Sequence, residues 1–333
     1  MKIRDPKSII IILVYAAVCC GIIGLSFLKR AQEINTSNKA QALAPEYTYI
    51  ENLDYFHLKN GVPLMSLSAT RMKSLGEETA EFEDPKGVYN YQQKNKSLRY
   101  QALEALYRKD KEILTLEKDV KVTSDEGDYF AQKLKYFFKQ DLIIGTVDVK
   151  FLGDDPKSGD KLNIASDKMK AWPNEQKTDF FGNVHGSFQR KKEYEGKMIF
   201  SSAVLNFDGN TSLAHLEGDV MMKRQSYLIT SGKADITLEN YNKSLKYFVL
   251  NDDVKVTETV HTPQGVQQRK AFSERLEGFG REQRMILSGA PRVEMGTDVV
   301  RGYRITIRED IDLIEVDDAV SDMLMKKKEK LKE

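Results

Sequence analysis

The dominant pattern along this chain is an alternation of apolar and polar residues, in short runs that begin beyond Pro45. Val149 and Phe151 flank Lys150, and the segment 304–308 alternates in the same way. Gly, Asp, Asn and Lys residues interrupt the runs at turn positions. A period of two residues is that of a β-strand with one buried face. The sequence therefore predicts an all-β body.

Two segments depart from this pattern. The charged segment 319–333 favours a helix at the end of the chain. Residues 98–108 fit either a short helix or a strand, because Tyr100, Ala102, Glu104 and Leu106 also alternate. Both interpretations of residues 98–108 stay open at this level.

The strand runs form an internal repeat. Five-residue units such as Leu116–Val120 and Leu216–Val220 open with a large apolar residue and close with valine. The closing valines are Val120, Val149, Val184, Val220, Val254 and Val293. They recur with a period of about 35 residues, and a turn and a second strand follow each one. One hairpin cannot bury its apolar face alone, so the repeat predicts a stack of two-strand units.

The third position of these units has its own signature. It holds Lys118, Gly182, Gly218, Asp252 or Gly289, although alternation places it on the same face as the apolar first and fifth positions. A small or turn-prone residue on an inward face is typical of a bulge or of a close backbone approach. We therefore expect each strand to be interrupted at this point.

The N-terminal segment has a different character. Residues 8–28 contain no charged side chain, and a 21-residue helix is long enough to cross a hydrocarbon core of about 30 Å. Three cations precede the segment and two follow it, which favours a cytoplasmic N-terminus. The alternative is a cleaved signal peptide, for which the apolar run is long. We expect residues 1–30 to form a cytoplasmic end and a membrane anchor, and residues 31–44 a linker.

Composition excludes several functions. Lys and Arg number 51 against 50 Asp and Glu, so the chain lacks the basic excess that nucleic-acid binding needs. Its two cysteines, Cys19 and Cys20, both lie in the apolar N-terminal run, and its four histidines have no metal-ligand spacing. Phosphate-binding loops and nucleophile elbows are also absent from the sequence. We therefore expect no enzyme activity, no catalytic residue, no metal and no cofactor.

The combination of anchor and repeat resembles a known family. The N-terminal apolar run, Pro45-Glu46-Tyr47 and the strands that end near Phe180–Val184 are similar to the LptC family of lipopolysaccharide transport proteins. Leu216–Val220 and Ile229–Ala234 are similar to the OstA/LptA module. The resemblance divides the body into an LptC-like module at 45–190 and an OstA/LptA-like module at 191–318, followed by the tail at 319–333.

This resemblance implies two stacked, partly open β-jelly rolls that form a groove for the acyl chains of lipopolysaccharide. An acyl chain of about twelve carbons would cost about 10 kcal/mol if it were left in water. The implied location is the inner membrane, through a single span, with the bulk of the chain in the periplasm. The implied partners are lipopolysaccharide and the permease subunits of an inner-membrane ABC transporter. Further OstA-like modules or the outer-membrane translocon are additional candidates.

Alternation selects the residues expected to face inward and to line this groove. They are Val120, Val122, Val147, Val149, Phe151, Val184, Val220, Met222, Val254, Val256, Val293 and Met295. An ordinary sandwich core has the same alternation, so the sequence does not separate a lipid groove from a closed interior. The first alternative function is a structural adaptor that only mediates protein contacts. The second is an enzyme on a β scaffold, which would need convergent polar groups that the sequence does not display.

Overall fold

The computed structural model describes residues 47–59, 61–90, 97–125, 127–154, 161–189, 197–239, 244–262, 265–279, 282, 284–308 and 313–322. The expected anchor at 8–28, the linker at 31–44 and residues 323–333 of the tail lie outside these ranges. Within them, no helix has the length and apolar character needed to cross a membrane.

The described chain is almost entirely β-structure, which confirms the all-β prediction. It contains a single short 3₁₀ helix, η1 (Pro173–Glu175). The strands are β1 (Tyr47–Lys59), β2 (Val62–Leu75), β3 (Thr79–Glu83), β4 (Lys86–Asn90), β5 (Ser97–Gln101), β6 (Glu104–Arg108), β7 (Ile113–Thr123), β8 (Asp128–Phe137), β9 (Leu142–Asp154), β10 (Lys161–Trp172), β11 (Lys177–Gln189), β12 (Met198–Asp208), β13 (Leu213–Arg224), β14 (Tyr227–Glu239), β15 (Ser244–Thr262), β16 (Gly265–Phe279), β17 (Arg284–Ser288), β18 (Arg292–Met295), β19 (Asp298–Arg301), β20 (Arg304–Arg308), β21 (Leu313–Asp317) and β22 (Val320–Asp322).

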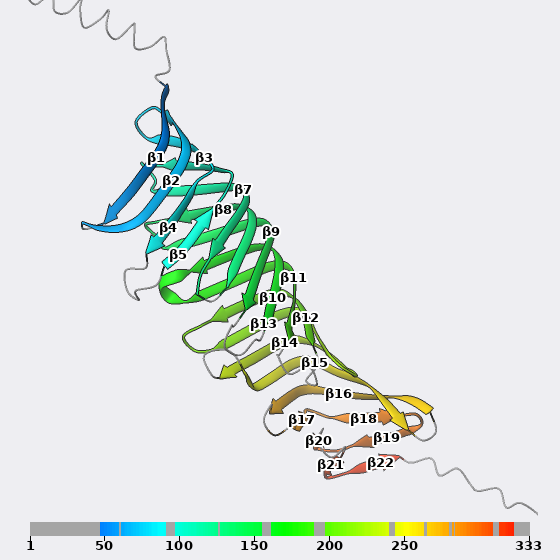
Figure 1. The fold of residues 1–333 in the computed structure, drawn as a ribbon. Helices are drawn as coiled ribbons and strands as arrows, with labels where there is room; N and C mark the ends of the chain where they lie inside the picture. The colour runs from blue at the N-terminus through cyan, green and yellow to red at the C-terminus, as the bar shows by residue number, and fades with distance from the viewer. Residues whose placement is uncertain are drawn as a thin grey trace, which may run out of the picture.

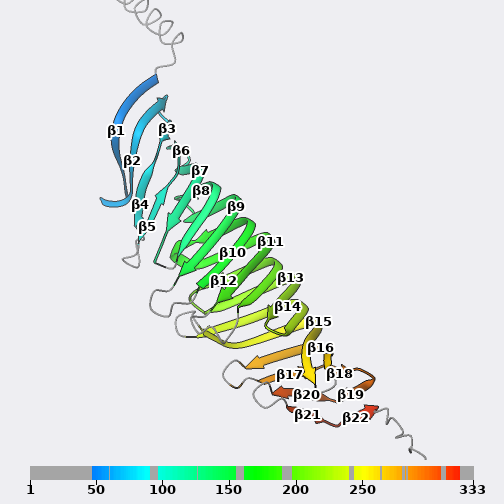
Figure 2. The ribbon, with the colours of Figure 1, turned by 45° about the vertical axis from the view of Figure 1, so that its right-hand side comes forward.

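Successive strands stack along one long axis, from β1 at one end to β21 and β22 at the other (Figures 1 and 2). From β7 to β16 each strand pairs with the next one in antiparallel fashion. The pairing between β11 and β12 joins the two predicted modules, so the sheet runs through their boundary without a break.

Most of the long strands bend sharply near their middle. In β13, residues 213–217 pair with one half of β14 and residues 220–224 with the other, and the register shifts between them. Gly218 and Asp219 fill the gap, with φ angles of 80° and 48°. Two consecutive residues in the left-handed region redirect β13, and corresponding pairs redirect β7, β9, β11 and β15. The strands between them follow the same register shift, so each of these strands contributes to two arms. The bulge expected at the third position is confirmed.

We name the two arms after the residues that line them. The leucine arm contains the strand halves with Leu116, Leu216 and Leu250, and the valine arm contains the halves with Val120 and Val220. Buried residues from both arms belong to one apolar core that extends from Leu64 to Ile307.

Serines support the bends from the neighbouring strands. The hydroxyls of Ser166, Ser202 and Ser231 each donate to the carbonyl two residues further along, at distances of 3.2, 2.9 and 3.0 Å. A register shift leaves backbone groups without a ladder partner, and a buried carbonyl needs a donor. Each of these serines lies opposite a closing valine on the neighbouring strand. Sequence reasoning missed them, because this position depends on how the strands pair.

The structure corrects two predictions and settles an open one. Val147 occupies the left-handed bend of β9, with φ of 64°, so it points outward and is 57% exposed. Residues 320–322 form β22, paired with β19, so the helix predicted from residue 319 is wrong there. Residues 98–108 form strands β5 and β6 rather than a helix.

The conformation of Val147 predicts a stabilising substitution. A β-branched side chain at positive φ is strained by about 1–2 kcal/mol, and this exposed side chain recovers little by burial. We expect Val147→Gly to raise the free energy of unfolding by about 1 kcal/mol, measured by denaturant titration. Val149→Gly is the matched control. Because Val149 is 0% exposed, its loss should cost about 3 kcal/mol. A destabilised Val147→Gly variant would contradict the assigned bend.

Candidate functional site: a continuous apolar inner surface

Ten of the twelve residues expected to face inward are buried. None of these ten is more than 8% exposed: Val120, Val122, Val149, Phe151, Val184, Val220, Met222, Val254, Val256 and Val293. Val147 is the exception explained above. Met295 is the second exception, because it lies at the tip of β18 beside a turn and is 37% exposed. Burial fixes the orientation of the ten, and their contact with lipid stays a prediction.

Cross-strand pairing links the inner residues of the valine arm into a row along the molecule. Directly opposed residues in an antiparallel pair share a face, so each pairing extends the row by one strand. The row consists of Tyr100, Val122, Tyr129, Phe151, Ile164, Gly186, Phe200, Met222, Ile229, Val256, Ala271, Val293 and Val300. No charged side chain interrupts it.

A second row runs along the leucine arm. It consists of Phe82, Ala105, Leu116, Leu134, Gly145, Met169, Phe180, Leu205, Leu216, Ala234, Leu250, Leu276, Leu287, Ile305 and Val316. Both rows cross from β11 to β12, through the pairs Gly186–Phe200 and Phe180–Leu205. The two predicted modules therefore share one apolar inner surface.

Glycines make room for large side chains on this surface. A Cβ built on Gly186 would lie 2.3 Å from the Cζ atom of Phe200, and one built on Gly278 would lie 2.0 Å from that of Phe248. Each ring therefore lies over the backbone of the neighbouring strand. This packing explains why glycine interrupts the row of the valine arm at Gly186, while Gly278 lies outside the two rows, two residues beyond Leu276 on the same strand.

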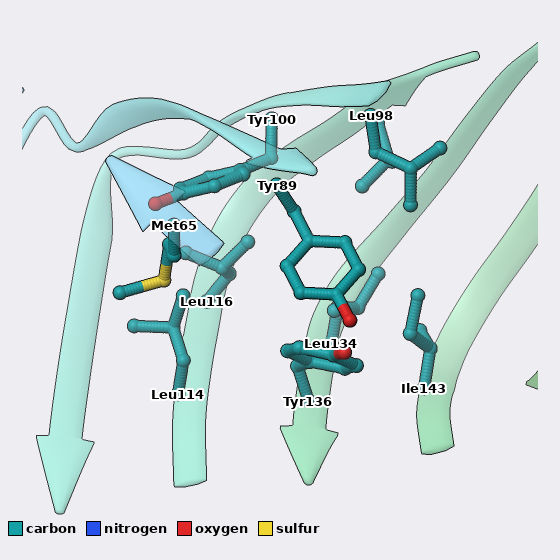
Figure 3. A pocket seen from close by; sticks show the side chains of 10 residues that line it. Met65, Tyr89, Leu98, Tyr100, Leu114, Leu116, Leu134, Tyr136 and Ile143 are labelled. Carbon is teal, nitrogen blue, oxygen red and sulfur yellow. The ribbon is translucent and has the colours of Figure 1, made fainter. Parts of the chain in front are cut away.

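The two arms are in contact. The closing valines and Leu216, Leu250 and Leu276 are almost fully buried. Near the N-terminal end a cavity of about 30 Å³ remains, a volume that fits about one water molecule. Both arms line it: Leu116 and Leu134 from one, Val122 and Tyr100 from the other (Figure 3). The inner surfaces thus lie against each other, whereas the resemblance implied a partly open groove.

One ion pair lies on the inner face of the valine arm, between the apolar row and the arm tip. Arg269 on β16 contacts Glu258 on β15 through Nε at 2.7 Å and through a terminal nitrogen at 2.5 Å. Their side chains are 9% and 13% exposed. Two bonds to one carboxylate compensate the cost of burying the charges. Sequence reasoning missed the pair, because its partners lie on different strands and only the register between β15 and β16 brings them together.

Buried tyrosines surround the cavity in the first module. The hydroxyl of Tyr100 donates to the carbonyl of Ser66 at 2.8 Å. Burial raises the pKa of Tyr89 to about 12, and it also raises the pKa values of Tyr100, Tyr107 and Tyr136. These hydroxyls therefore remain neutral hydrogen-bond donors at physiological pH.

Residues 13–189, more than half of the chain, match the model of the lipopolysaccharide-assembly, LptC-related family. The chain belongs to the LptC-related family. Residues 201–312 match the family of LptA and the LptD N-terminal domain, described as lipopolysaccharide transport proteins. The predicted resemblance of an LptC-related region followed by an LptA-like region is confirmed.

Comparisons with individual proteins add little to this assignment. A solved structure of LptH, the LptA-homologous periplasmic component of the lipopolysaccharide transport device of Pseudomonas aeruginosa, is similar to part of the LptC-related chain. The identity is 14%, the TM-score is 0.35, and the alignment covers 39% of this chain and 95% of LptH. That similarity is too distant to establish a shared fold. No curated protein sequence matches the chain significantly.

The inward ion pair gives a stability prediction. Glu258→Leu leaves the charge of Arg269 buried without its carboxylate, so we expect the free energy of unfolding to fall by about 3 kcal/mol. The double variant Glu258→Leu, Arg269→Met removes both charges and should recover most of this loss. Denaturant titration of both variants checks the pair, and a double variant as unstable as the single one would contradict the assigned burial.

The raised tyrosine pKa values predict a loss of stability at alkaline pH. The folded-state pKa values lie above the unfolded value of about 10. The contribution of these neutral hydroxyls to the free energy of unfolding is therefore fully present below about pH 10. It is lost as the pH rises through the folded values, which for Tyr89 means about 12. We expect these tyrosines to ionise only as the first module unfolds, detected as a late phase of tyrosinate absorbance. Titration of all 15 tyrosines in one phase near their ordinary pKa would contradict this.

Proposed function

We propose that this protein carries lipopolysaccharide by sheltering its acyl chains between the leucine and valine arms, and that it passes them along the stack. The observation that supports this most strongly is the continuity of the two apolar rows across the boundary between β11 and β12. A conduit requires an apolar surface that continues from one family region into the next, and both rows meet this requirement.

Acyl chains would enter by parting the two arms. The bends fix one edge of the arms covalently, while their other edges end in separate hairpin turns. A chain that slides between the arms exchanges one apolar contact for another, so the amount of buried apolar surface changes little. The saccharide part of the lipid would stay outside, in water.

We further propose that residues 8–28 anchor the chain in the inner membrane, with the body in the periplasm. The permease subunits of an ABC transporter would load the N-terminal module. The transporter would also supply the energy for transport, because this sequence contains no nucleotide-binding loop. The C-terminal strands β21 and β22 would hand the lipid on towards the outer membrane. Edge strands of this kind accept a further strand readily.

A periplasmic adaptor that binds only proteins is the second candidate. The close contact between the arms favours it, since a closed core needs no ligand. The two functions differ in one respect: only the carrier brings lipid into contact with the inner residues.

Photo-crosslinking distinguishes these functions. A photoreactive amino acid at Val220 or Val254, both 1% exposed, faces the space between the arms. Lys255, next to Val254 and exposed on the outer face, is the matched control. With purified full-length protein and lipopolysaccharide, we expect adducts at both inner positions and none at Lys255. No adduct at any inner position of a folded protein would contradict the carrier and favour the adaptor.

A further inference from the structure

One carboxylate joins the tips of the two arms in the first module. Asp141 lies in the turn after β8, at the tip of the leucine arm, and Tyr89 lies near the end of β4, in the valine arm. An oxygen of Asp141 accepts a hydrogen bond from the Tyr136 hydroxyl at 2.9 Å and another from the Tyr89 hydroxyl at 3.2 Å. We call these three residues the clasp.

Neighbouring contacts hold the clasp in place. The second carboxylate oxygen of Asp141 accepts the backbone N–H of Asn174 from η1 at 2.8 Å, which orients the carboxylate. The rings of Tyr89 and Tyr136 pack edge to face, with centroids 4.7 Å apart, and Phe138 packs against Tyr136 at 4.4 Å. Figure 3 shows the two tyrosine rings together at the edge of the cavity, with their hydroxyls close to each other.

The clasp differs from other polar contacts around the same cavity, because it connects opposite arms. Tyr100 lines the cavity as Tyr89 does, but its hydroxyl bonds to Ser66 on β2, and β2 and β5 both flank β4 in the valine arm. The bond from Tyr136 to Asp141 stays within the leucine arm. The bond from Tyr89 to Asp141 must break when these two tips separate.

We propose that the Tyr89–Asp141–Tyr136 clasp is a lateral gate, which must open before an acyl chain can pass between the arms of the first module. This inference rests on the proposed carrier function. The bend side of the arms is continuous chain and cannot open. At the tips, by contrast, water or the hydroxyls of a saccharide can replace the hydrogen bonds of the clasp as the arms part.

The gate also fits its surroundings. Below the clasp lies the apolar cavity lined by Met65, Leu116 and Val122, into which the end of a chain could advance. Both tyrosines keep their protons well above neutral pH, so in the clasp two neutral hydroxyls donate to one carboxylate oxygen of Asp141. The sugar and water contacts that replace it need no change of charge.

Loading kinetics test the gate. Full-length protein with the photoreactive residue at Val120, the closing valine of β7 in the first module, is mixed with lipopolysaccharide, and the rate of adduct formation is followed over time. Tyr89→Phe keeps the ring and removes the hydroxyl bond between the arms, so we expect loading to become roughly three to ten times faster. Tyr247→Phe is the matched control, because it removes a tyrosine hydroxyl bond of 2.7 Å to the carboxylate of Glu277 between neighbouring strands of one arm, outside the two rows and the clasp. Its loading rate should equal that of the wild type.

A locked variant tests the same gate in the opposite direction. Tyr89→Cys with Asp141→Cys, in a Cys19→Ser, Cys20→Ser background, is joined by a short bifunctional thiol reagent. We expect the joined protein to load much more slowly than the same protein before joining. This comparison holds the sequence constant, so altered folding of the variant cannot imitate the result.

The outcomes separate the gate from the carrier function. If the wild type forms adducts, but Tyr89→Phe loads at the rate of Tyr247→Phe and joining has no effect, the gate is wrong and the carrier stands. If the wild type forms no adducts at Val220 or at other inner positions, the carrier itself fails. Faster loading of Tyr89→Phe together with slower loading after joining supports the gate.

Discussion

The structure depends on one constraint of backbone geometry, the pair of left-handed residues at the bend of every second long strand, from β7 to β15. Gly218 and Asp219 in β13 and Asp252 and Asp253 in β15 take positive φ angles at corresponding places. Each pair redirects its strand, so that one strand supplies both arms. The apolar faces of the two arms then lie opposite each other along the whole stack, without a separate element to close the core.

This geometry yields an interior that is continuous but not covalently closed. The bends join the arms on one side only, and apolar contact holds them together elsewhere. Apolar contact is non-directional, so a hydrocarbon chain can cover either inner surface as well as the opposing arm does. A closed core and a lipid carrier are therefore two states that the same surfaces support. Polar contacts between the tips, such as that of Tyr89 with Asp141, set how readily one state gives way to the other.

The sequence predicts the repeat, the all-β class and the bulge, because each depends on local pattern. It predicts ten of the inward residues for the same reason. It fails at Val147, because the bend of β9 shifts the alternation and turns this residue outward. The rows across strands, the serines opposite the valines and the Glu258–Arg269 pair depend on register between strands. The clasp joins residues 52 positions apart in turns and strand ends, where no periodicity applies. The contact between the arms also escaped prediction, since an open groove and a closed core require the same alternation.

The separation of the arms with and without lipid is the decisive quantity. Spin labels at Leu213 and Lys223 would report it, because these exposed residues lie at opposite ends of β13, one at the tip of each arm. The labelled protein would carry serine at positions 19 and 20, and electron spin resonance would give the distance distribution. If acyl chains lie between the arms, lipopolysaccharide shifts this distribution to longer distances. An unchanged distribution in protein shown to have bound lipopolysaccharide would contradict it.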